Sequence, residues 1–218
     1  MSSTEDTALA PATDELRDAM VERLTAVLGD AVEGVLVKPG DDLWVRVRSD
    51  AWVKAVTACR DLLAMDYFCF LSGLDWLPSP FGKGEDDPTE PPPERSTAIV
   101  QGYAGGNTRW QVFVRLYSTK RRVGITLKAD VADDDPRIAT LTTVYPGANW
   151  HERECWEMYG IEFDGHPNLV NMYLPTEFEG HPLRKDFPLL ARLVKPWPGI
   201  VDVEPMPGGD DEGEGDAS

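Results

Sequence analysis

The chain has 218 residues, 42% of them hydrophobic, which is enough for one domain with a substantial core. Its formal net charge is −17, so binding to nucleic acid or to an anionic lipid surface is not expected. No window approaches eighteen consecutive apolar residues, which argues against a membrane-spanning helix. Any membrane association is therefore expected to come through other proteins.

The two ends of the chain and its cysteines also narrow the class of protein. Residues 1–12 contain acids and no apolar run, so they are predicted to be a flexible N-terminus and not a signal or transit peptide. Residues 201–218 hold seven acids and no base, which predicts a disordered acidic tail. The cysteines at 59, 69 and 155 form no CxxC pair and fit a reducing compartment. These features predict a cytosolic protein.

Hydrophobic periodicity predicts an alternating series of helices and strands. In chain order the predicted elements are a helix at 14–28, strands at 32–37 and 43–48, a helix from 49 or 50 to 64, strands at 67–71, 96–104, 109–118 and 122–129, a short helix at 136–143 and a helix at 149–160. Asp14 or Thr13 is expected to cap the first helix, and Ser49 or Asp50 the second. The turn Gly105-Gly106-Asn107 predicts a hairpin between the strands on either side of it.

This order of elements predicts an α+β domain over residues 13–160, with a mostly antiparallel mixed sheet and helices on one face. Residues 77–95 contain six prolines and several acids, so a mobile surface insertion is predicted there. After Gly160, which supplies a left-handed helix stop, prolines at 167, 175, 182 and 188 alternate with apolar residues. We predict that residues 161–200 form an extended segment that lies against its own domain or against a partner.

The helix at 149–160 contains the side chains that are the best candidates for metal binding or catalysis. Asn149 and Glu152 have the spacing of a capping box. A metal site at His151 and Glu152, as in a free-standing metal-dependent hydrolase, is an alternative, but no second histidine follows four residues on. Cys155 lies four residues from His151, yet the acids around it would raise the pKa of the thiol. Glu152, Glu154 and Glu157 are interpreted with Arg153 as a solvated or partner-facing ion network.

The sequence predicts no catalytic, cofactor-binding or metal-binding residue. It contains no GxGxxG motif, no P-loop and no set of cysteines that could hold an iron–sulfur cluster. The basic pair Arg184-Lys185 is unusual in an acidic chain. Arg184 could pair with a carboxylate on another subunit, or the two residues could simply be exposed to solvent. Trp76, Trp150, Trp156 and Trp197 are expected to be packing residues inside the protein.

The region from 144 to 188 resembles the signature of one protein family. That family is the 30 kDa subunit, designated C, of the proton-pumping NADH:quinone oxidoreductase, respiratory complex I, and the resemblance covers roughly residues 15–190. The matching residues are Glu152, Arg153, Glu154, Glu157, Gly165, His166, Pro167, Gly180, His181, Pro182, Leu183, Arg184, Lys185 and Asp186. One departure is Val170, where the family pattern usually has a basic residue or proline.

The resemblance implies a structural, cofactor-free subunit of the peripheral arm of a bacterial translocase, on the cytoplasmic side of the cell membrane. FMN, the iron–sulfur clusters, NADH and quinone would be bound by other subunits, and no catalysis is expected from the isolated chain. The segment 161–200 would lie along the quinone-site subunit, designated D, with the iron–sulfur subunits B and I among the other partners. Deletion of 161–218 is expected to leave the domain folded but unable to assemble. An equivalent subunit of a ferredoxin-fed dehydrogenase or a membrane-bound hydrogenase is the alternative within the family.

Overall fold

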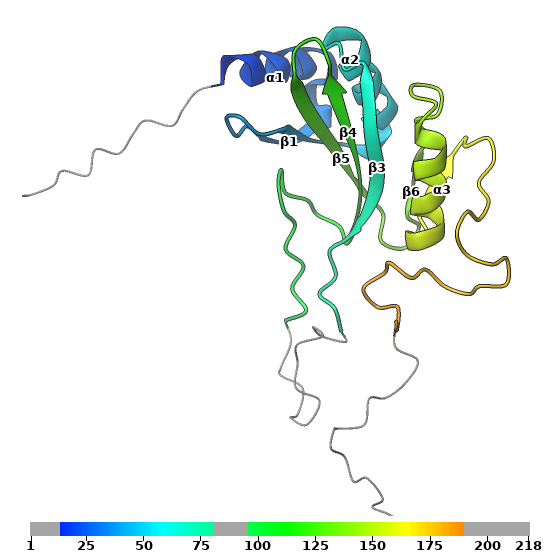
Figure 1. The fold of residues 1–218 in the computed structure, drawn as a ribbon. Helices are drawn as coiled ribbons and strands as arrows, with labels where there is room; N and C mark the ends of the chain where they lie inside the picture. Colours follow the sequence, from blue (N-terminus) through cyan, green and yellow to red (C-terminus); the bar gives the residue numbers. More distant parts are fainter. Residues whose placement is uncertain (1–13, 81–95, 190–218) are drawn as a thin grey trace, which may run out of the picture.

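The computed structural model describes residues 14–80 and 96–189 and shows a sheet with helices packed on it (Figure 1). The elements are α1 (Glu15–Leu28), η1 (Gly29–Ala31), β1 (Val32–Leu36), β2 (Leu43–Val47), η2 (Ser49–Ala51), α2 (Trp52–Leu62), β3 (Tyr67–Asp75), β4 (Trp110–Ser118), β5 (Val123–Val131), β6 (Arg137–Ala139), α3 (Ala148–Tyr159) and β7 (Glu162–Asp164). The predictions for residues 1–12, for most of 77–95 and for the chain from 190 onward lie outside the described residues.

The main sheet has five strands in the order β1-β2-β5-β4-β3. The pair β2–β5 is parallel, whereas β1–β2, β4–β5 and β3–β4 are antiparallel. The short strands β6 and β7 form a separate parallel pair. The prediction of an α+β domain with a mostly antiparallel mixed sheet is therefore confirmed.

One face of the five-stranded sheet carries the hydrophobic core and all three helices of the described chain. Side chains alternate between the two faces of a strand, so Val45, Leu127 and Val114 point to the same side. Trp52 of α2 has no exposed surface there. α3 lies along the edge strand β3 (Figure 1), because Gly73 leaves room for it: a Cβ at Gly73 would stand 3.0 Å from the Cys155 sulfur.

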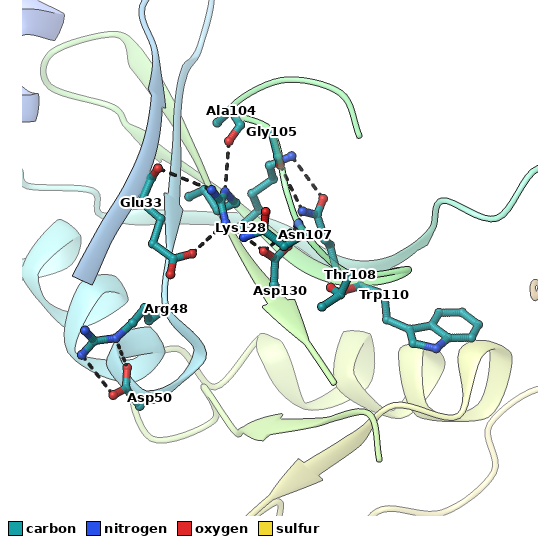
Figure 2. A network of polar contacts seen from close by, with 12 residues as sticks. Glu33, Arg48, Asp50, Ala104, Gly105, Asn107, Thr108, Trp110, Lys128 and Asp130 are labelled. Carbon is teal, nitrogen blue, oxygen red and sulfur yellow. Dashed lines mark hydrogen bonds and ion pairs between the residues drawn. The ribbon is translucent and has the colours of Figure 1, made fainter. Parts of the chain in front are cut away.

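The opposite face of the sheet carries no helix of the described residues but is partly covered by the irregular segment 96–109. The carbonyl of Ala104 accepts a hydrogen bond from the Arg46 guanidinium, and Asn107 donates its backbone N–H to Asp130 (Figure 2). The predicted strand at 96–104 and its hairpin with 109–118 are wrong. β4 is already paired on both sides, by β3 and β5, so it has no free edge for another strand.

The predicted helix at 136–143 is also wrong, because residues 137–139 form the strand β6 and residues 140–143 form no helix. Its residue Ile138 is buried in the core, and Glu162 donates its backbone N–H to the carbonyl of Pro136 at 2.8 Å. Proline and the preceding acids suit a helix start equally well, so the local signal did not distinguish the two structures. The partner strand β7, some 25 residues later, decides the outcome.

The predicted caps are only partly correct. Asp14 accepts the backbone N–H of Arg17 and caps α1 as predicted. Neither Ser49 nor Asp50 makes a side-chain cap at α2, and the Asp50 carboxylate instead pairs with Arg48 at 3.0 Å (Figure 2).

The core continues past Gly160. Ile161 has no exposed surface and Phe163 is also buried, and both belong to the hydrophobic cluster. The observed core therefore extends beyond the predicted domain boundary at 160, and a deletion that starts at 161 would remove core side chains. In the described part of the chain, no helix is long and apolar enough to cross a bilayer.

Candidate partner-binding site

Glu152 anchors α3 to the core instead of facing solvent. Its carboxylate has no exposed surface and accepts hydrogen bonds from the Thr140 hydroxyl at 2.5 Å and the Leu141 backbone N–H at 2.6 Å. Burial raises the pKa of Glu152 to about 7. The capping box is wrong, because α3 begins at Ala148 and no side chain caps it. The ion-network interpretation is likewise wrong for Glu152.

Glu157, one turn and a half further along α3, binds the backbone of the segment that follows. Its carboxylate accepts the backbone N–H groups of Met172 at 3.0 Å, Tyr173 at 3.0 Å and Leu174 at 2.7 Å. Burial opposes ionisation, but these three donors together with Arg153 outweigh it and lower the pKa of Glu157. Glu157 is thus an ionised, buried acceptor for three consecutive backbone groups and not part of a solvated network.

Arg153 complements Glu157 by binding carbonyl groups next to the same stretch. Its guanidinium donates to the backbone oxygens of Val170 at 3.0 Å and Asn171 at 2.9 Å. Arg153 and Glu157 therefore both bind the backbone of 170–174. The side chain of Val170 takes no part in this contact, since only its carbonyl is used and the side chain is exposed.

The residues around His181 bind the last carbonyl groups of α3, which have no partner inside the helix. The ring Nδ1 of His181 lies 2.8 Å from the Glu157 carbonyl, Leu183 donates its N–H to Met158, and Arg184 donates to Tyr159 at 2.6 Å. Gly160 has a φ of +72°, and a Cβ there would collide with His181 and Arg184. The predicted left-handed stop at Gly160 is confirmed, and the contact explains why glycine is needed there.

A second group of charges fastens residues 184–186 to the ends of β3 and β4. The Asp75 carboxylate, with a side chain 0% exposed, binds Arg109 at 2.8 Å and accepts the backbone N–H of Lys185 at 2.8 Å. Arg109 also pairs with Asp186 at 2.9 Å, which lowers the pKa of Asp186. The guanidinium carbons of Arg109 and Arg184 lie 4.1 and 4.9 Å from the centre of the Trp110 ring.

The remaining signature residues shape the turns of the segment. His166 lies with Nε2 3.1 Å from the Asn149 carbonyl, and its Nδ1 accepts the N–H of Asn168 at 3.1 Å. Gly165 and Gly180 have φ values of +83° and +95°, which favour glycine. No hydrogen bond or ion pair joins the side chains of Glu154 or Lys185 to any other described residue.

The apolar side chains of the same region point away from these contacts. Six large hydrophobic residues of α3 and the segment after it are exposed: Trp150 69%, Val170 44%, Tyr173 60%, Phe178 40%, Leu183 48% and Leu189 76%. The expectation that Trp150 packs inside the protein is therefore wrong. The polar signature holds the backbone inward, and these side chains remain available to another molecule.

The geometry does not bring His151 and Glu152 into one site. His151 packs edge-on against Phe68, with ring centres 5.4 Å apart, whereas Glu152 is held by Thr140 and Leu141. Cys155 is buried, which raises the pKa of its thiol. Within residues 14–80 and 96–189, no three His, Cys, Asp or Glu side chains gather as metal ligands. What the region does is fasten one segment to the domain.

Comparison with known proteins supports the resemblance in the sequence. The family model described as the 30 kDa subunit of respiratory-chain NADH dehydrogenase matches residues 45–192, more than half of the chain. The chain belongs to this family. The predicted resemblance to the complex I 30 kDa subunit is thereby confirmed, and the matched range spans the positions of the signature residues named above.

Curated relatives of this chain are named as subunits of NADH-quinone oxidoreductase. The chain is 48% identical over 88 residues to the C/D subunit of NADH-quinone oxidoreductase from Pectobacterium atrosepticum, and 47% identical over 88 residues to the protein of the same name from Yersinia pestis. Each match covers 40% of this chain and 15% of the relative. The chain therefore aligns with only a small part of the length of these relatives.

The fold is also found in a solved respiratory assembly. A chain in the structure of the membrane-bound sulfane sulfur reductase, an archaeal respiratory membrane complex, aligns with a TM-score of 0.54 and 20% identity. The alignment covers 80% of this chain and 86% of that one. This similarity shows a shared fold.

The sequence analysis did not identify the residues of the domain that contact the signature residues. Thr140, Asp75, Arg109 and Trp110 lie outside the signature and come from three separate stretches of the chain. An arginine next to a tryptophan at the start of a strand was the available local signal for the Arg109–Trp110 pair. The partner residues of this pair are 34 and 77 positions away, and no local pattern links them.

Proposed function

We propose that this chain is a structural subunit of the peripheral arm of a proton-translocating NADH:quinone oxidoreductase, on the cytoplasmic side of the cell membrane. In this proposal the segment from Gly165 to Leu189 docks on the quinone-site subunit, designated D, and the iron–sulfur subunits B and I are further neighbours. Membership of the 30 kDa subunit family supports the assembly. The combined designation C/D of the curated relatives supports the adjacency of this chain and the quinone-site subunit.

The proposal rests on one observation about the C-terminal segment: its backbone is bound to the domain, whereas its large apolar side chains are exposed. Glu157 and Arg153 bind its backbone, and its own Arg184 side chain donates to the Tyr159 carbonyl of α3. The large apolar side chains of Tyr173 and Leu183 remain exposed. A segment that is already ordered loses less conformational entropy on binding than a disordered one. Apolar burial on a partner contributes roughly 25 cal/mol per Å² before the costs of association. Such a segment is suited to docking.

The proposed role is mechanical and involves no cofactor held by this chain. NADH would be oxidised at FMN, and electrons would pass through iron–sulfur clusters to quinone in the other subunits. The geometry described for His151, Glu152 and Cys155 supports structural roles, because each side chain is packed or bonded within the domain. This weighs against the free-standing metal-dependent hydrolase.

The electron donor of the complex is the point on which the alternative differs. A ferredoxin-fed dehydrogenase or a membrane-bound hydrogenase would use an equivalent subunit, and the fold shared with the sulfane sulfur reductase chain does not select between them. The identity of 48% to a subunit of NADH-quinone oxidoreductase favours NADH.

A tagged pull-down from gently solubilised membranes tests the proposal. We expect the full chain to recover a large assembly that contains FMN and iron–sulfur clusters and oxidises NADH with quinone as acceptor. The paired change Tyr173→Ser and Leu183→Ser should reduce recovery, whereas Leu16→Ser, which removes a similarly exposed leucine (40%) from α1, should not. Recovery of the wild-type chain alone, or an assembly that transfers electrons only from ferredoxin or hydrogen, would contradict the proposal.

A further inference from the structure

The turn between β4 and β5 carries three consecutive exposed bases, Lys120, Arg121 and Arg122, in a chain whose net charge is −17. We call residues 120–122 the basic turn. Four other solvent-accessible bases each pair with an acid at most three positions away, namely Lys38, Arg48, Arg60 and Arg137. Within residues 14–80 and 96–189, no ion pair joins a side chain of the basic turn to an acid. The basic turn thus presents three positive charges without a counter-ion from the described chain.

The basic turn is ordered, and the acid beside it is already bound. Arg122 donates its backbone N–H to the Ser118 carbonyl at 2.8 Å. The Asp66 carboxylate accepts the backbone N–H of Thr119 at 2.8 Å and its hydroxyl at 2.5 Å. These bonds lower the pKa of Asp66. The backbone of the turn is therefore fixed by Ser118 and Asp66, and its basic side chains take no part in this.

Arg122 occupies a backbone conformation that favours glycine. Its φ is +54°, in the left-handed region that residues with a Cβ rarely adopt. The turn joins Ser118 to Val123, which are paired across the two strands. Glycine would form this turn without strain, so the geometry of the turn does not account for arginine here. Strain of this kind is a reason to look for a role of the side chain.

The same chain contains a segment of opposite charge, because residues 202–216 include seven acids and no base. The chain that leads to them is fastened beside the start of β4, where Asp186 pairs with Arg109 at 2.9 Å. The basic turn follows the other end of β4 (Figure 1), and this strand of nine residues is about 30 Å long. The fifteen residues between Asp186 and Asp202 can span up to about 50 Å. The acids can therefore reach the basic turn.

We propose that the acidic residues between Asp202 and Asp216 bind the basic turn of the same chain. A single exposed ion pair contributes little, but several opposite charges act together here. The covalent connection also holds the acids near the turn at an effective concentration in the millimolar range. The contact is electrostatic and weakens as salt screens the charges. It goes beyond the proposed function and does not depend on it.

Zero-length cross-linking with a carbodiimide tests this contact in the purified full-length chain. The reagent joins an amine to a carboxylate in contact with it, and Lys120 supplies the amine of the basic turn. We expect an amide between Lys120 and an acid of residues 202–216 at low salt, with a yield about tenfold lower in about 1 M salt. Lys54, which is exposed in the first turn of α2, is the matched control and should form no such link.

A mixture of isotope-labelled and unlabelled chains shows which molecule supplies the carboxylate. We expect the two halves of each cross-linked peptide to carry the same label. Three results would overturn the inference: no link between Lys120 and residues 202–216, an equal yield from Lys54, or links that mainly join labelled to unlabelled chains. In the third case a second copy of the chain would be the partner of the basic turn.

The paired change Arg121→Gln and Arg122→Gly separates the charge of the turn from its fold. We expect the Lys120 link to form at a rate about threefold lower or less. The melting temperature should not fall, because glycine adopts the φ of +54° without strain. Arg23→Gln, which removes an exposed base from α1, should leave the link unchanged. An unchanged link in the paired variant, or an equal loss in Arg23→Gln, would overturn the inference.

The two proposals fail in different ways. If the chain recovers no partners from membranes, the proposed function is wrong, whereas the link from Lys120 is measured on the purified chain and is unaffected. If this link is absent and the chain assembles, only the contact between the acidic residues and the basic turn is lost.

Discussion

The layer formed by α1 and α2 and the segment after α3 are attached to the same domain by different interactions. α1 and α2 pack through apolar side chains such as Met20, Leu24 and Trp52, all at most 1% exposed. The segment after α3 is held by side chains that bind backbone groups, chiefly Glu157 and Arg184. The first attachment is non-directional, whereas the second fixes individual backbone atoms.

The difference follows from where each backbone finds its hydrogen bonds. A helix satisfies most of its own N–H and C=O groups, so it needs only an apolar stripe to pack. An irregular segment has no ladder, and its backbone groups need partners from side chains, water or other segments. Two charged residues of the family signature, Arg153 and Glu157, meet this need for the backbone of 170–174.

The largest loss of stability is expected from a substitution in the apolar layer formed by α1 and α2. Trp52→Ala should lower the free energy of unfolding by about 3–5 kcal/mol, because it empties a fully buried site. The Trp52 indole N–H lacks a partner among the described residues, so Trp52→Phe should cost much less than the alanine change. Denaturant unfolding of the two variants measures the difference, and equal losses would contradict the assignment of Trp52 to a packed core.

The next effect concerns the buried carboxylate that joins α3 to the loop after β6. The pKa of Glu152 is about 7 when folded, above its ordinary value of 4.5. Its contribution to stability is therefore complete below pH 4.5 and is lost as the pH rises through 7. The total loss is about 3 kcal/mol for a shift of this size.

Glu152→Gln should remove this pH dependence, because glutamine is neutral and keeps an acceptor for the Leu141 N–H. Unfolding free energies measured between pH 5 and 7.5 should fall for the wild type relative to the variant. Parallel curves for the two proteins would show that Glu152 does not titrate in this range.

Glu157 and Asp186 behave in the opposite way, because their folded pKa values are lowered. Their contributions to stability are lost as the pH falls through these folded pKa values.

A smaller and local effect is expected at the segment. Glu157→Gln removes the charge and leaves one acceptor oxygen for the three N–H groups of 172–174. The loss should be about 1–3 kcal/mol, confined to the opening of this segment. Limited proteolysis with mass spectrometry should show faster cleavage between 165 and 189. Glu154→Gln is the matched control, and equal protection in both variants would contradict the role of Glu157.

The smallest effect on stability is expected from the outward side chains. Tyr173→Ser should change the free energy of unfolding by less than about 0.5 kcal/mol, because the ring is 60% exposed. Its effect should be seen instead in the recovery of partner subunits. A large loss of thermal stability in the isolated variant would show that Tyr173 packs on its own domain.

Local periodicity was sufficient to predict much of the fold. α1, α2, α3 and the strands β1, β2, β4 and β5 match their predicted ranges closely, since each has an apolar pattern that its own residues define. The predictions fail where the structure of a segment depends on pairing with a strand far away in the sequence. Residues 137–139 form a strand because β7 pairs with them, and residues 96–104 form none because β4 has no free edge.

The same reasoning applies to the site. The resemblance identified which residues matter, and Gly160 could be assigned a conformation from sequence alone. The direction in which Glu152 and Glu157 point could not, because it depends on Thr140 and on the backbone of 172–174, which the helix pattern does not contain. A charged residue in a helix is usually exposed to solvent. Glu152 and Glu157 are exceptions, because they are buried and accept backbone N–H groups.

Amide hydrogen exchange of the isolated full-length chain tests most directly whether the domain itself orders the segment after α3. We predict that the N–H groups of Met172, Tyr173, Leu174 and Leu183 are protected before any partner binds, because Glu157 and the Met158 carbonyl accept them. Exchange of these four amides at the rate of an unstructured peptide would contradict this attachment, since the segment would then become ordered only on its partner.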